Sequence, residues 1–274
     1  MQARFLDLHE YQSKALMAKH GVRVQKGEMA ESAAEAEAAA QRIQAAGAKE
    51  LVLKSQILAG GRGKGTFNTG FKGGVKVVKM PKEVGELAAK MLGNRLVTKQ
   101  TGPEGQPVSK VLVHEGINFK QELYFAIILD RAAGGPCIVA SPMGGVDIEE
   151  VAEKHPEQIF TQPIDIIKGI QPEQTARLAK LLGFKEGSAQ FADAQTQMKA
   201  LYDLFIANDC AQVEINPLVV TDQGLVYCVD AKLGFDDNAS FRQEKLFAQR
   251  DFSMEDQREV CVCRRFFVCL LCGF

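Results

Sequence analysis

The sequence has neither an excess of charge of one sign nor a long apolar run. Its formal net charge is −1, so nothing points to nucleic acid or to an anionic membrane as a partner. No run of about eighteen apolar residues is present, and we therefore expect no membrane-spanning helix. The first eight residues show no secretory signal and turn acidic too early for a transit peptide. The 46% hydrophobic and 24% charged residues are typical of a soluble globular protein.

The seven cysteines fall into two groups. Three stand singly in apolar segments, which predicts buried thiols in a reducing compartment: Cys137, Cys210 and Cys228. The others crowd the last fourteen residues: Cys261, Cys263, Cys269 and Cys272. Their spacing is compatible with zinc. We favour an apolar segment, because phenylalanine, valine and leucine fill the gaps where metal-binding knuckles usually have glycine and polar turns.

Helices and strands are mixed along the chain in an order typical of an α+β protein. Capping residues and prolines predict helices at 8–20 (capped by Asp7), 33–46, 81–93, 148–154, 173–182 and 193–207. Short apolar runs predict strands at 50–54, 75–79, 95–99, 110–114, 122–129 and 137–140. Tight turns often join consecutive strands, which favours antiparallel sheets over a doubly wound parallel sheet.

A predicted hairpin carries the first candidate site. The apolar segments 213–218 and 226–232 flank the turn sequence Thr-Asp-Gln-Gly. Glu214 and Asn216 would share one face, with Asp230 on the neighbouring strand. Hard oxygen donors on rigid strands suit Mg²⁺, which usually takes one or two protein groups together with nucleotide phosphates. A surface hairpin with scattered polar groups is an equal alternative.

The glycine-rich stretch 59–65 is the second candidate site. It departs from the P-loop pattern because Gly65 follows Lys64, and from the dinucleotide fingerprint because a strand comes next. Glycine exposes backbone N–H groups, and Lys54, Arg62 and Lys64 add positive charge, which together suit a cover for polyphosphate. The alternative is a flexible hairpin.

Together the two sites predict a clamp around a nucleotide. Between them, residues 113–117 end a strand with the mixed polarity of a hinge that hydrogen-bonds a purine. Glu115 and Glu122 are either acceptors for ribose hydroxyls or surface charges, and we expect His114 on the solvent side. The arrangement favours a nucleotide-dependent ligase.

These residues also carry a family likeness. The chain resembles the β subunits of succinyl-CoA synthetase (succinate–CoA ligase) over about residues 5–258. The motifs that carry the resemblance are His9-Glu10-Tyr11-Gln12, Lys54-Ser55-Gln56, Gly60-Gly61-Arg62-Gly63-Lys64, Gly73-Gly74-Val75, Gly144-Gly145-Val146-Asp147, Glu214-Ile215-Asn216-Pro217, Asp230-Ala231-Lys232 and Asn238-Ala239. The resemblance implies an ATP-grasp fold at residues 5–245, with two α+β lobes that clamp a nucleotide.

The resemblance also implies an activity and its partners. Family members couple succinyl-CoA cleavage to GTP or ATP formation in the tricarboxylic acid cycle, through a phosphohistidine on an α subunit. We therefore expect Mg²⁺ as cofactor, a heterodimer with that α subunit, and succinate and CoA in the complete enzyme. The mitochondrial matrix is the implied compartment. None of the four histidines matches the phosphorylated one, so the α subunit is required.

Site residues are carried over by position. The residues implied to hold the nucleotide are Gln25, Lys54, Gly61, Arg62, Gly63, Glu115, Ile117 and Glu122. Asn216 and Asp230 are the implied metal ligands. Glu214, facing the phosphohistidine, and Arg62 are the implied catalytic residues, which fits a reaction that needs positioning and charge neutralisation. Glutamine at position 25 is typical of the GDP-forming branch, and its amide donates to guanine O6, so we expect GDP over ADP.

The chain departs from the family after about residue 259. Family members continue into a flavodoxin-like domain that serves the succinate site and contacts the α subunit, and we expect that domain to be absent here. Residues 246–259 would begin the linker to it, and 260–274 would be an atypical tail. We therefore expect nucleotide and Mg²⁺ binding with little ligase activity. The alternatives are a non-catalytic nucleotide-binding form, or another ATP-grasp acyl-CoA ligase such as a malate–CoA ligase.

Overall fold

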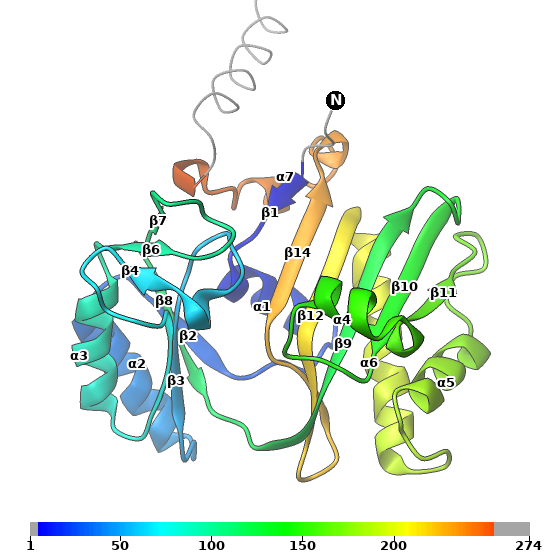
Figure 1. Ribbon diagram of the computed structural model, residues 1–274, viewed down its shortest axis with the longest axis horizontal. Helices are drawn as coiled ribbons and strands as arrows, with labels where there is room; N and C mark the ends of the chain where they lie inside the picture. The colour runs from blue at the N-terminus through cyan, green and yellow to red at the C-terminus, as the bar shows by residue number, and fades with distance from the viewer. Residues whose placement is uncertain (1–4, 255–274) are drawn as a thin grey trace, which may run out of the picture.

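The computed structural model describes residues 5–254. They form two lobes, with helix α1 (Glu10–Lys19) lying where the lobes meet (Figure 1). Each lobe has its own antiparallel sheet and its own cluster of buried apolar side chains. None of the helices within residues 5–254 has the length and apolar character needed to cross a bilayer.

The first lobe is a four-stranded sheet covered by two helices. Its strand order is β2 (Gly27–Ala30), β8 (Val111–Glu115), β3 (Leu51–Ser55) and β5 (Val75–Val78). The helices are α2 (Ala33–Ala45) and α3 (Pro81–Met91). A smaller antiparallel sheet continues the lobe with β4 (Thr66–Phe67), β6 (Arg95–Val97) and β7 (Gln106–Pro107). As expected, Ser32 caps α2, and its hydroxyl accepts from the N–H of Glu35 at 3.2 Å.

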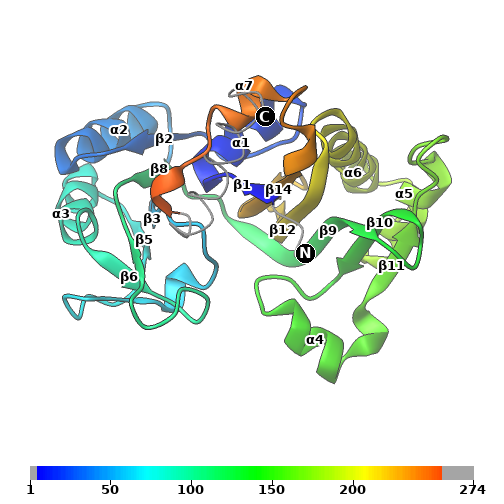
Figure 2. The ribbon, with the colours of Figure 1, turned by 90° about the horizontal axis from the view of Figure 1, so that it is seen from above.

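The second lobe is a seven-stranded antiparallel sheet. Its strands in order are β1 (Phe5–Asp7), β14 (Ala231–Asp236), β12 (Cys210–Thr221), β9 (Phe119–Asp130), β10 (Gly135–Ser141) and β11 (Phe160–Pro163), with β13 (Val226–Cys228) paired to β12. Helices α5 (Pro172–Leu181) and α6 (Ala189–Ala207) pack into the core on one face. Seen from above, α4 (Ile148–Lys154) lies on the other side of the sheet from α6 (Figure 2). The remaining short helices are α7 (Glu244–Phe247), η1 (Arg62–Lys64), η2 (Pro156–Gln158), η3 (Asp237–Ala239) and η4 (Phe252–Met254).

The α+β class with antiparallel sheets is confirmed, since every pairing between these strands is antiparallel. Asp7 as the cap of the first helix is wrong. Asp7 pairs with Gly234 as the last residue of β1, and His9 caps α1 instead. The three single cysteines are buried and free, as predicted. The four cysteines at 261–272 lie outside the described residues.

The hairpin at 213–232 forms, but its second segment is not one strand. It is divided into β13 and β14, which pair with successive parts of β12. The break faces an irregularity in β12 after Ile215, where Pro217 has no N–H to donate to a ladder. Asp230 therefore lies in the connection between β13 and β14 and not within a strand. Asn216 still lies beside it, because the N–H of Asn216 donates to the carbonyl oxygen of Asp230 at 3.1 Å.

Candidate functional site

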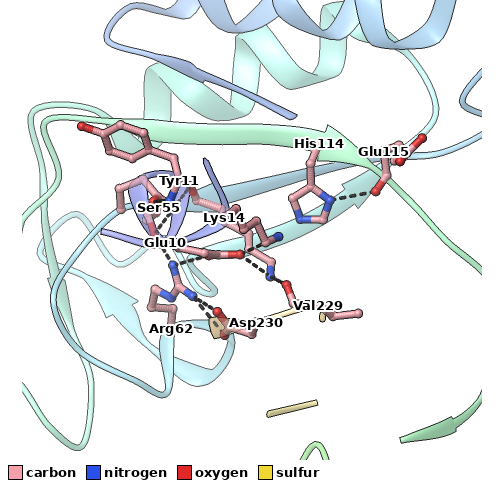
Figure 3. Close-up of polar contacts among 11 residues, drawn as sticks. Glu10, Tyr11, Lys14, Ser55, Arg62, His114, Glu115, Val229 and Asp230 are labelled. Carbon is pink, nitrogen blue, oxygen red and sulfur yellow. Dashed lines mark hydrogen bonds and ion pairs between the residues drawn. The ribbon is translucent and has the colours of Figure 1, made fainter. Parts of the chain in front are cut away.

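Five charged side chains meet at the join between the lobes (Figure 3). Glu10 and Lys14 come from α1, Lys54 from β3, Arg62 from η1, and Asp230 from the connection after β13. The ion pairs among them connect elements of both lobes through α1. We call these five residues the junction cluster.

Glu10 is the centre of the junction cluster, and its side chain is only 2% exposed. One carboxylate oxygen, Oε1, lies 3.0 Å from the ammonium nitrogens of both Lys14 and Lys54. The other, Oε2, lies 2.8 Å from Nη1 of Arg62. Burial alone would raise the pKa of Glu10, but the three cations outweigh it and hold that pKa well below its usual value. Glu10 is therefore a carboxylate that is buried and fully ionised at neutral pH.

Arg62 ties the cluster to the second lobe. Its Nη2 donates to both carboxylate oxygens of Asp230, at 2.8 and 3.0 Å, and its Nη1 donates to the carbonyl oxygen of Ser55 at 3.1 Å. Contacts of Nη2 with Asp230 and of Nη1 with Ser55 and Glu10 together fix the plane of the guanidinium group as well as its position. The side chain of Arg62 is 8% exposed and that of Asp230 is 38% exposed. The cluster consequently reaches solvent on the side of Asp230.

Lys54 is held in the same way from two directions. Its ammonium group donates to Glu10 Oε1 at 3.0 Å and to the carbonyl oxygen of Val229 at 3.3 Å. Val229 precedes Asp230, so this cation also reaches the connection between β13 and β14. Lys54 and Arg62, both predicted to hold phosphates, are thus brought together by the fold.

The histidine at position 114 is buried, and its expected place on the solvent side is wrong. Its side chain points inward from β8 between strands β2 and β3, and the residue is 2% exposed. Its Nδ1 donates to the carbonyl oxygen of Glu115 at 2.7 Å. Burial, with the charges of Lys14 and Lys54, keeps the pKa of His114 well below its usual value. The imidazole is therefore neutral.

Asn216 and Asp230 suit a metal ion that is shared with phosphates. Asn216 Oδ1 accepts from the N–H of Gly145 at 2.7 Å, and its Nδ2 donates to the carbonyl oxygen of Val146 at 2.8 Å, which fixes the amide. No set of three or more His, Cys, Asp or Glu residues among those described is arranged to hold a metal. Asn216 and Asp230 are nonetheless neighbours through a backbone hydrogen bond, and their oxygens are hard donors of the kind that bind Mg²⁺ together with nucleotide phosphates. The donor set fits the expected ion.

Glu214 lies on the face of the large sheet that is turned away from its core. Its neighbours in β12, Val213 and Ile215, are fully buried in the core, so the alternation of the strand places Glu214 on the opposite face. Burial raises the pKa of Glu214, and Lys232, its cross-strand partner in β14, partly offsets this. The result is a carboxyl group that binds a proton more readily than a free one.

The other predicted nucleotide residues do not all meet at the junction cluster. The carboxylate of Glu115 accepts from the N–H of Lys26 at 2.9 Å and borders a hollow of about 440 Å³ together with Gly116. Figure 3 shows Glu115 beyond His114, away from Arg62. Ile117 follows in the connection between β8 and β9.

Glu122 and Gln25 have separate surroundings. A Cβ on Gly145 would lie 2.8 Å from a carboxylate oxygen of Glu122, so this carboxylate lies against the loop that holds Asn216. Gln25 is 4% exposed, and its buried Oε1 has no hydrogen-bond partner among the described residues. An unsatisfied buried amide is costly, which fits a residue whose partner is a ligand.

The glycines of the loop differ in what the fold demands of them. Gly61 has φ +74°, a left-handed conformation that favours glycine. Gly63 is exposed, and a Cβ there would meet nothing within 4 Å. The fold itself therefore gives no steric reason for a glycine at position 63.

Glu10 and Lys14 are site residues that the sequence reasoning missed. Both belong to the buried residues of α1, which are Glu10, Ser13, Lys14 and Met17. This is the spacing of the inward stripe of a helix, but three of the four side chains are polar. A charged stripe where an apolar one is expected was the signal available in the sequence.

Comparison with known proteins identifies the fold family of the chain. A sequence model of the ATP-grasp domain matches residues 7–220. The chain belongs to the ATP-grasp family. Among solved structures, this ATP-grasp chain is similar to ATP citrate lyase from Methanothrix soehngenii in complex with citrate and coenzyme A, with a TM-score of 0.65, 18% identity, and coverage of 91% of this chain and 55% of that one. At this identity the likeness shows the fold alone.

Curated relatives of this ATP-grasp chain are far closer in sequence. It is 55% identical over 260 residues to the mitochondrial GDP-forming succinate–CoA ligase subunit beta of Dictyostelium discoideum, covering 94% of this chain and 60% of the relative. It is 53% identical to the ADP-forming subunit of the same organism (94% and 57% covered), and 54% identical to the GDP-forming subunit of Mus musculus (93% and 58% covered). The chain thus spans about 60% of the length of such relatives.

Proposed function

We propose that this chain is the nucleotide-binding part of a succinate–CoA ligase β subunit, formed by residues 5–245. One observation carries the proposal: Glu10 holds Lys54 and Arg62 together at the join between the lobes, beside Asp230. In the whole enzyme, succinyl-CoA, phosphate and a nucleoside diphosphate would give succinate, CoA and the triphosphate. An α subunit would supply the phosphohistidine, and the relatives' mitochondrial names favour the matrix as compartment.

The residues divide the work of phosphoryl transfer between binding and positioning. Lys54 and Arg62 neutralise charge on the phosphates, while the backbone at Gly61 and Gly63 approaches them closely. Asn216 and Asp230 would hold Mg²⁺, which when bound neutralises phosphate charge further. Glu214 faces the phosphohistidine of the α subunit and orients its imidazole.

Binding of the nucleotide exchanges partners within the junction cluster. Arg62 and Asp230 neutralise each other through two hydrogen bonds, at 2.8 and 3.0 Å. A phosphate group can satisfy the guanidinium of Arg62 as the carboxylate does, and Asp230 would then be free to hold Mg²⁺. One ion pair would thus be replaced by two, which would offset part of the cost of separating Arg62 from Asp230.

The nucleotide base would be bound by residues near the connection between the lobes. Gln25 reads guanine through its amide, while Glu115, Ile117 and Glu122 hold the base and ribose. Overall identity does not separate the two nucleotides, because GDP-forming and ADP-forming relatives match at 55% and 53%. The buried Oε1 of Gln25 has no partner among the described residues and can accept from an N–H of a base. The preference for GDP rests on the amide N–H₂ of the same side chain, which would donate to guanine O6.

Calorimetric titration of the chain with GDP and with ADP, each with Mg²⁺, tests the proposal. We expect both to bind and GDP to bind more tightly. Failure of both to bind would contradict the proposal, and tighter ADP binding would contradict the role of Gln25.

Coexpression with a succinate–CoA ligase α subunit tests the whole reaction. CoA-dependent GTP formation with succinyl-CoA supports a ligase subunit, whereas turnover only with malyl-CoA supports the malate-specific alternative. Nucleotide binding without any turnover by a stable complex supports the non-catalytic alternative.

A further inference from the structure

Hydrogen bonds made by neighbouring residues hold the backbone at Glu10, independently of the contacts of its own side chain. His9 Nε2 lies 2.9 Å from Asp251 Oδ2, and Gln12 Nε2 donates to the carbonyl oxygen of Gln249 at 3.0 Å. The N–H of Tyr11 donates to the side chain of Gln56 at 3.1 Å. The start of α1 is thereby attached both to the segment after α7 and to the residue that follows β3. Glu10 is a carboxylate on a rigid support.

The two oxygens of Glu10 divide between cations from different elements. Oε1 pairs with Lys54 of β3, and Oε2 pairs with Arg62 of η1. One carboxylate therefore sets the distance between the ammonium group of Lys54 and the guanidinium group of Arg62. Lysine and arginine side chains have many rotamers, and two like charges repel. Without the carboxylate, only the partly exposed segment Val229–Asp230, which binds Lys54 through a carbonyl and Arg62 through a carboxylate, would hold the two cations toward each other.

Stability alone does not account for this arrangement. A buried set of charges is often no more stable than apolar residues of the same volume, because desolvation offsets the Coulombic gain. α1 contributes two charged residues to the cluster where an apolar stripe would pack the lobes together. The cluster instead keeps two cations at a fixed spacing next to Asp230, its most exposed member.

We infer that Glu10 is a positioning residue, which holds Lys54 and Arg62 at the spacing that binds the terminal phosphates of the nucleotide. This inference rests on the proposed function. It gives α1, which contributes none of the residues assigned to the nucleotide, an indirect part in phosphate recognition. Glu10 acts through the two cations and does not touch the nucleotide itself.

Glu10→Gln tests the inference, with Glu28→Gln as its matched control. Glutamine keeps the size of the side chain but loses its charge, and its amide nitrogen cannot accept from a cation. Glu28 pairs with Arg42 on the surface, away from the junction cluster. We expect Glu10→Gln to weaken Mg·GTP binding about 10- to 100-fold, measured by calorimetry on folded protein, with a much smaller loss for GMP. Glu28→Gln should bind GTP and GMP as the unsubstituted chain does.

A second variant separates positioning from simple charge balance. The cluster has three cations and two carboxylates, a net charge of +1, which Glu10→Gln raises to +2. Adding Lys14→Met returns it to +1 without restoring the contacts to Lys54 and Arg62. We expect the double variant to regain thermal stability but to keep the weak binding of GTP.

Three results would overturn the inference while leaving the proposed function intact. The first is a folded Glu10→Gln variant that binds GTP as tightly as the unsubstituted chain. The second is recovery of GTP affinity in the double variant. An equal loss for GTP and GMP would show that the terminal phosphates are not involved. Binding by the unsubstituted chain is measured first. If that chain binds neither GTP nor GDP, the proposed function fails and the inference fails with it.

Discussion

At the scale of single residues, Glu10 links the charge of the site to the stability of the fold. The cations around it hold its folded-state pKa well below the ordinary value of 4.5. A depressed pKa means that the unfolded chain binds the proton more tightly. The stability that Glu10 contributes is therefore fully present above pH 4.5 and is lost as the pH falls from there through the folded-state pKa.

We expect this loss to be visible in urea unfolding measured between pH 7 and pH 3. The free energy of unfolding of the unsubstituted chain should fall below about pH 4.5, and that of Glu10→Gln should fall less over the same range. Glu28→Gln is the control, because the side chain of Glu28 is 41% exposed and solvent screens its pairing with Arg42. Parallel curves for the unsubstituted chain and Glu10→Gln would contradict the assigned charge state.

Gly63 provides a prediction at the same scale. A Cβ at this position meets no atom within 4 Å, so Gly63→Ala should fold with nearly unchanged stability. It should weaken GDP binding about tenfold if the backbone approaches the phosphates as proposed. Gly135→Ala is the control, since its nearest atom would be 3.7 Å away at a site far from the loop. Unchanged GDP affinity in Gly63→Ala would contradict the proposed contact between Gly63 and the phosphates.

At the scale of elements, the loop between β10 and α4 holds the side chain of Asn216, a residue of the proposed metal site. The N–H of Gly144 donates to the carbonyl oxygen of Glu122 at 3.1 Å, and the next two residues hold the amide of Asn216. A Cβ on Gly144 would overlap the backbone of Leu123 in β9. The loop therefore has to move if any side chain is placed there.

Gly144→Ala should destabilise the fold by about 1–3 kcal/mol and weaken the Mg²⁺ dependence of nucleotide binding. Thermal unfolding and calorimetry at several Mg²⁺ concentrations measure the two effects. Val146→Ala is the control, because Val146 is exposed and contributes only its backbone carbonyl to Asn216. Wild-type Mg²⁺ dependence in Gly144→Ala would show that the loop does not support the site.

Local sequence signals predicted most elements and only part of the site. Ser32, Pro81 and the apolar runs located helices and strands because caps, prolines and periodicity act over a few residues. The pairing of Arg62 with Asp230 joins residues 168 positions apart, and no local pattern encodes such a contact. His114 was misplaced for the same reason, since its burial comes from neighbouring strands.

At the scale of the molecule, the two lobes are separate cores joined by a charged contact. Each lobe buries its own apolar cluster, and Met17 of α1 belongs to that of the second lobe. The same inward stripe of α1, nearer its start, contributes Glu10 and Lys14 to the junction cluster, where Lys54 and Arg62 arrive from the first lobe. A polar contact of this kind favours adjustable lobes, because ion pairs exchange partners more readily than a packed apolar interface does.

Arg62, within this contact, is the residue proposed to hold the phosphates of a nucleotide. Calorimetric titration of Arg62→Gln with GDP and Mg²⁺ tests this role most directly, with Arg42→Gln as the control for an exposed arginine. We predict that the unsubstituted chain and Arg42→Gln bind alike and that Arg62→Gln binds at least about tenfold more weakly. Equal affinity in all three proteins, or no binding by the unsubstituted chain, would contradict the account.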